Sequence, residues 1–118
     1  MKSRLTPDHH AQLEALRRAY EEDLPRRVQE VVEAMAALSG PVPSPEAIEA
    51  AYHLVHRLNG SSAIYGFEAV HRPAAELDRL LARAMEVRAT GGLDASLAVH
   101  LEELRRAVAV TRPEGERG

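Results

Sequence analysis

Apolar residues recur every three or four positions along most of the chain, a spacing typical of amphipathic helices. The first segment with this spacing runs from about Pro7 to Leu38, and its apolar positions are Leu13, Leu16, Tyr20, Leu24, Val28, Val31, Met35 and Leu38. Pro25 lies inside it, so we expect the helix to be kinked or broken near Leu24. A loop rich in proline and glycine, residues 39–43, then ends this segment.

A second helix is predicted from Ser44 to about Tyr65. Ser44 has the side chain of an N-cap residue, and Pro45 suits the first helical position because its backbone lacks an N–H group. Gly66 is placed to end the helix in a left-handed conformation.

Two more helices complete the pattern. The third covers about residues 69–88, with an inward face of Leu77, Leu80, Leu81 and Ala84. Pro73 is tolerated there if it lies in the first turn and kinks the helix otherwise. Asp94 is the expected N-cap of the fourth helix, which extends to about Val110 and places Leu97, Leu101, Leu104 and Val108 on one face.

These segments predict an all-α fold, an antiparallel up-down four-helix bundle over residues 1–110. Strand alternation and internal repeats are absent from the sequence, and short loops between long helices favour antiparallel neighbours. The polar tail, residues 111–118, has no apolar pattern, and we expect it to be disordered.

Composition narrows the possible functions. The chain has 118 residues, enough for one domain, and 45% of them are apolar but only 3% aromatic, which favours close helix packing. A net charge of −3 argues against nucleic-acid binding, and the lack of cysteine excludes disulfides and thiolate metal sites. No apolar run resembles a signal peptide or a membrane span. We therefore expect a cytoplasmic protein that is a monomer and binds neither membrane nor nucleic acid.

A glycine in the middle of the second predicted helix is the strongest indication of function. Gly60 costs roughly 1 kcal/mol relative to alanine and lies one turn after His56 on the same face. At about 100° per residue, both fall opposite an apolar stripe, together with Tyr52, His53, Asn59 and Ala63. That stripe is predicted to be the core face: Ala47, Ala51, Leu54, Leu58, Ser61 and Tyr65. Packing therefore does not explain Gly60, whereas clearance for a large partner over the His56 ring does.

The motif His56-Arg57-Leu58-Asn59-Gly60-Ser61-Ser62-Ala63, followed by Tyr65-Gly66-Phe67, resembles the signature of histidine-containing phosphotransfer (HPt) domains. That family carries a His-x-Leu-Lys-Gly-Ser type motif on the second helix of a four-helix bundle. The segments Leu24-Pro25-Arg26-Arg27-Val28 and Ala75-Glu76-Leu77 are also similar to the family, and the resemblance extends from about Leu13 to Val110.

The resemblance implies that His56 is a phosphoacceptor in a phosphorelay of two-component signalling. The phosphoryl group would pass between aspartates of response-regulator receiver domains, with a hybrid sensor kinase as a further candidate partner. The chain would need no cofactor of its own, since Mg²⁺ is expected on the receiver. The predicted docking patch around the histidine consists of Tyr52, His53, Val55, Ala63 and Ile64. Asn59 stands where the family usually has lysine; it is expected to support the phosphoryl group by hydrogen bonding, without a charge.

Two alternatives remain open on the sequence. A metal-binding bundle would use Glu-x-x-His units, but only Glu68-Ala69-Val70-His71 fits and two are needed, so no metal site is predicted. A non-catalytic HPt-like adaptor, which docks on a kinase or receiver and inhibits it, would share the bundle and the patch. An enzyme is not predicted, because no nucleophile–base pair or phosphate-binding glycine loop is present.

Overall fold

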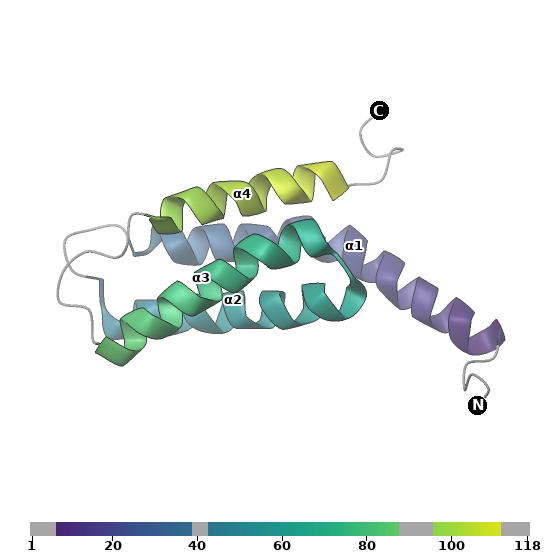
Figure 1. The fold of residues 1–118 in the computed structure, drawn as a ribbon, viewed down its shortest axis with the longest axis horizontal. Helices are drawn as coiled ribbons and strands as arrows, with labels where there is room; N and C mark the ends of the chain where they lie inside the picture. Colours follow the sequence, from purple (N-terminus) through teal and green to yellow (C-terminus); the bar gives the residue numbers. More distant parts are fainter. Residues whose placement is uncertain (1–6, 39–42, 88–95, 112–118) are drawn as a thin grey trace.

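The computed structural model describes residues 7–38, 43–87 and 96–111, which form four helices. They are α1 (Pro7–Ala36), α2 (Pro45–Tyr65), α3 (Glu68–Val87) and α4 (Ser96–Thr111). Consecutive helices run in opposite directions along one long axis (Figure 1). The fold is therefore the all-α, antiparallel up-down bundle that the apolar spacing predicts.

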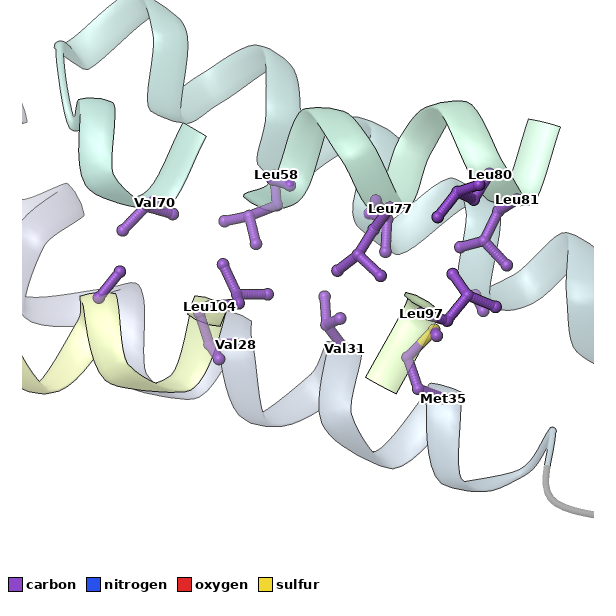
Figure 2. Close-up of a cluster of buried hydrophobic side chains, with 14 of the residues drawn as sticks. Val28, Val31, Met35, Leu58, Val70, Leu77, Leu80, Leu81, Leu97 and Leu104 are labelled. Atoms are coloured by element: carbon purple, nitrogen blue, oxygen red, sulfur yellow. The ribbon is translucent and has the colours of Figure 1, made fainter. Parts of the chain in front are cut away.

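The four helices enclose one hydrophobic core. Each helix packs against two neighbours, α1 and α3 each lying against both α2 and α4. Side chains from all four meet in the middle, where Leu77 of α3 lies opposite Val31 of α1 and Leu58 of α2 lies opposite Leu104 of α4 (Figure 2). Burying apolar side chains of this size stabilises the fold by roughly 1.5–3 kcal/mol each. The bundle is thus a rigid support for whatever its surface carries.

Helix α1 passes through Pro25 without a break. Its ribbon changes direction where it joins the other three helices, and its first part extends beyond them (Figure 1). Residues 8–16 are accordingly exposed, including Leu13 at 48% and Leu16 at 53%. These two leucines continue the apolar spacing of α1, but neither belongs to the described core or to the partly buried residues packed against it.

The α2–α3 hairpin has the predicted ends. The Ser44 side chain accepts a hydrogen bond from the Ala47 backbone N–H at 3.0 Å, which caps the start of α2. Gly66 closes α2 with φ at +78°, and the Phe67 backbone N–H donates to the Ser62 carbonyl at 2.9 Å. Since α3 begins at the next residue, the turn fixes which residues of α2 and α3 face each other.

Some predictions fall on other parts of the chain. Asp94, expected to cap α4, and the tail beyond Thr111 lie outside the described residues; Thr111 itself is the last residue of α4. Pro73 is buried in the second turn of α3, beyond the first turn where proline is best tolerated.

None of the described helices is both long and apolar enough to cross a membrane.

Candidate functional site

His56 lies in the middle of α2 with its side chain 60% exposed. Its ring stacks on Tyr52, one turn earlier, with the ring centroids 5.3 Å apart. Its Nδ1 atom lies 2.8 Å from Oδ2 of Asp78 on α3. Because a carboxylate can only accept, the neutral imidazole donates its Nδ1–H, which leaves the lone pair on Nε2. Nε2 is therefore the nucleophilic atom of an exposed ring whose orientation is fixed from both sides.

Asp78 is the residue that sequence reasoning missed. Its side chain is only 14% exposed, at the border between α2 and α3. His56 is eleven residues before Phe67 and Asp78 eleven after it, so an antiparallel hairpin turning at Phe67 brings the two together. The signal was present in the sequence, because Asp78 directly follows the inward-facing Leu77 and lies at the edge of the apolar face of α3.

Asn59 belongs to the same cluster. Its side-chain Nδ2 donates to Asp78 Oδ2 at 2.9 Å, the same oxygen that accepts from His56. Its Oδ1 is buried and, among the described residues, has no hydrogen-bond partner. Its backbone carbonyl lies 3.2 Å from the ring Nδ1 of His71. The amide thus faces the carboxylate, and its support of a phosphoryl group by direct contact stays a prediction.

Gly60 faces open space, as predicted. A Cβ atom built at this position meets no atom within 4 Å outside the local helix backbone. Of the described glycines only Gly66 has a positive φ, so Gly60 does not need the conformational freedom of glycine. Neither packing nor backbone geometry accounts for Gly60. Its predicted role, clearance for a partner over the His56 ring, stays a prediction.

The predicted docking residues divide into two groups. Ala63 and His53 are exposed, Ile64 is 81% exposed and Tyr52 is half-buried, so a partner can reach these four from solvent. Their role in docking stays a prediction. Val55 was predicted wrongly, because it is fully buried in the core.

The error at Val55 came from the orientation of the predicted core stripe on α2. The residues buried on α2 are Ile48, Ala51, Val55, Leu58 and Ser62. Four of the six predicted stripe residues are only partly buried: Ala47, Leu54, Ser61 and Tyr65. Because α2 packs against both α1 and α3, its buried arc is wide and centred near Val55. His56 consequently lies at the α3 border of the exposed face, within reach of Asp78.

The two serines of the motif have structural contacts. Ser62 is buried and donates to the Leu58 carbonyl at 2.7 Å. The Ser61 hydroxyl lies 2.6 Å from the Tyr20 hydroxyl and thereby joins α2 to α1. Burial of the Tyr20 ring raises the pKa of its phenol, so it stays protonated and able to donate. These serines hold the helix that carries His56 rather than taking part in chemistry.

The Glu-x-x-His unit does not form a metal site in the structure. Glu68 lies 3.7 Å from Arg72, and His71 contacts the Asn59 carbonyl. Within residues 7–38, 43–87 and 96–111, no three histidine, aspartate or glutamate side chains are grouped to hold an ion.

Comparison with known proteins agrees with this geometry. The family model described as the Hpt domain matches residues 7–109, nearly all of the chain. No curated protein and no solved structure matches it. The match covers every residue of the cluster formed by His56, Asn59, Gly60 and Asp78.

Proposed function

The chain belongs to the Hpt domain family, and on that premise we propose that His56 carries a phosphoryl group between the aspartates of receiver domains in two-component signalling. The observation that carries the proposal is the exposed ring itself, with Nδ1 bonded to Asp78 and Nε2 left as the nucleophile. Open space at Gly60, one turn away, gives a receiver room to close over that atom.

The transfer step needs no proton to leave the attacking nitrogen. The Nε2 lone pair forms a bond to the phosphorus of an aspartyl phosphate, and the phosphorus–oxygen bond to the aspartate breaks, with the electron pair leaving on the carboxylate. The Nδ1 proton stays on the ring, which gains a positive charge facing Asp78. Donation to the next receiver reverses these steps. Phosphoryl transfer depends on positioning and charge stabilisation, so a rigidly held ring suffices on this side.

The receiver supplies the rest of the reaction centre in this proposal. Its acidic pocket would hold Mg²⁺, and that ion would neutralise the charge on the phosphoryl oxygens. Tyr52, His53, Ala63 and Ile64 form the surface on which the receiver docks. The chain itself acts as a phosphoryl carrier, in keeping with a family of phosphocarrier modules.

The test is transfer of labelled phosphate from phosphorylated receivers of the host to His56→Gln and to a matched control. His10→Gln is that control, because His10 is an exposed histidine on α1, outside the proposed docking surface. We expect His56→Gln to take up no label and His10→Gln to take up as much label as the native protein. Label retained on His56→Gln contradicts the proposal.

The same assay separates the carrier from the adaptor. An adaptor would bind the receiver or kinase and lower its phosphorylation without becoming labelled itself. A native protein that takes no label from any receiver, yet inhibits one of them, supports the adaptor and overturns the carrier.

A further inference from the structure

Asn59 holds a position that the family usually gives to lysine, yet its amide faces inward rather than towards the exposed ring nitrogen. One oxygen, Oδ2 of Asp78, accepts from Asn59 Nδ2 at 2.9 Å and from His56 Nδ1 at 2.8 Å. The two donors lie three residues apart on one face of α2, and the acceptor comes from α3. The Asn59 side chain thus contacts Asp78, whereas a lysine at this position would place a positive charge near the phosphoryl group.

We propose that Asn59 is a positioning residue that acts through Asp78. Its amide holds the carboxylate against His56 Nδ1 and so keeps the imidazole in the tautomer and ring orientation that leave Nε2 as the nucleophile. We call the two hydrogen bonds to Asp78, from Asn59 and from His56, the clamp. The clamp is present in the free protein, and its effect on phosphoryl transfer rests on the proposed phosphocarrier role of His56.

Burial makes the clamp effective. Asp78 is 14% exposed, so water cannot readily replace a lost donor, whereas His56 at 60% exposure could exchange a weakened bond for water. The amide has one favourable orientation, because turning it over would place its oxygen against the Asp78 carboxylate. Its own Oδ1 is buried without a partner in the described part of the chain, a cost that the bond to Asp78 offsets.

Lysine at position 59 is expected to act against this arrangement. An ammonium group beside Asp78 would attract the carboxylate and compete with the Nδ1–H of His56 for the same oxygen. Restoring the residue usual in the family should therefore loosen the imidazole rather than improve the site. If Asn59 instead contacted the phosphoryl group directly, the added charge of lysine would leave the free imidazole unchanged and prolong the life of the phosphohistidine.

The experiment reads the tautomer of His56 from the ¹⁵N chemical shifts of its ring in the unphosphorylated protein. The variants are Asn59→Ala, Asn59→Lys, Asp78→Ala and the double alanine variant, all compatible with a helix. We expect Asp78→Ala, which removes the hydrogen bond to His56 Nδ1, to lower the ratio of Nδ1–H to Nε2–H tautomer about fivefold, the factor that corresponds to one ordinary hydrogen bond. Asn59→Ala and Asn59→Lys, which loosen that bond without removing its acceptor, should lower the ratio by a smaller factor. In the Asp78→Ala background, Asn59→Ala should have no further effect, since its target is gone.

Glu76→Ala serves as the control, because Glu76 is a carboxylate on the same helix that pairs with Arg79 instead. It should leave the His56 shifts unchanged. Chemical phosphorylation of His56 Nε2 by phosphoramidate, a small phosphoryl donor, should slow in Asn59→Ala and Asp78→Ala in proportion to the fraction of Nδ1–H tautomer that each variant loses.

Additive effects of the two alanine changes, or an unchanged tautomer ratio in Asn59→Ala, overturn the inference. These readouts require no receiver, so a failure of the phosphocarrier proposal would appear separately, as absent transfer from receivers with the tautomer effects intact.

Discussion

Replacing Gly60 separates access to His56 from the stability of the helix that carries it. Gly60 lies within α2, has no positive φ, and a Cβ there meets nothing within 4 Å. Gly60→Ala should therefore gain the full difference in helix propensity, about 1 kcal/mol, because no clash or strain opposes it. For a domain of this size that gain corresponds to a rise in Tm of about 4 °C.

Gly60→Gln gains nearly the same stability, because glutamine is also a good helix former. Its longer side chain, however, extends from the position one turn after His56 into the space a receiver would occupy. We expect Gly60→Ala to retain much of the transfer rate and Gly60→Gln to lose most of it, while both variants melt at a higher temperature than the native protein.

Thermal melts followed by circular dichroism and phosphotransfer from a receiver measure the two effects separately. Ala50→Gln is the control for bulk, because Ala50 is exposed on the same helix, away from the site. Normal transfer by Gly60→Gln would refute the clearance argument. A lower Tm for Gly60→Ala would contradict the conclusion that Gly60 has an unstrained helical backbone with open space beside its Cα.

Two further predictions concern stability. Val55→Ala should destabilise the fold by about 2–3 kcal/mol in denaturant unfolding, because it removes two methyl groups from a fully buried position; a change under 0.5 kcal/mol would contradict that burial. The hydrogen bond from Arg26 holds the pKa of Asp23 below its ordinary value of 3.8. The stability from this pair is therefore present above about pH 4 and is lost as the pH falls through the lowered pKa. Asp23→Asn should weaken this dependence of the unfolding free energy on acid pH. An unchanged pH profile of unfolding would contradict a contribution of the Arg26–Asp23 pair to stability.

Local signals in the sequence were sufficient to predict the four helices and both ends of α2. Ser44 and Gly66 act on backbone groups a few residues away, so their roles follow from residue type and position alone. The outward direction of Gly60 follows from helical periodicity in the same way. Apolar spacing also identified α1, but it could not tell that Leu13 and Leu16 stay exposed. The spacing shows which face of a helix is apolar, but it does not show whether another helix covers that face.

The missed parts of the site depend on contacts between helices. Val55 was misplaced because a single helical wheel assumes one buried direction, whereas α2 is covered by α1 and α3 together. Asp78 was missed because its role depends on the register of the hairpin, set by the turn at Gly66. Both could be recovered by treating α2 and α3 as one paired unit rather than as separate helices.

The stacking of Tyr52 on His56 gives the protein an optical reporter of its own state. The chain contains no tryptophan and three tyrosines, and two of these, Tyr20 and Tyr65, stack on each other away from the histidine. Tyr52 lies 5.3 Å from the His56 ring, so charge added there alters the surroundings of one tyrosine fluorophore in three. If His56 carries a phosphoryl group as proposed, we expect the ultraviolet emission of the protein to follow that phosphorylation in real time, without a radioactive label or an attached dye.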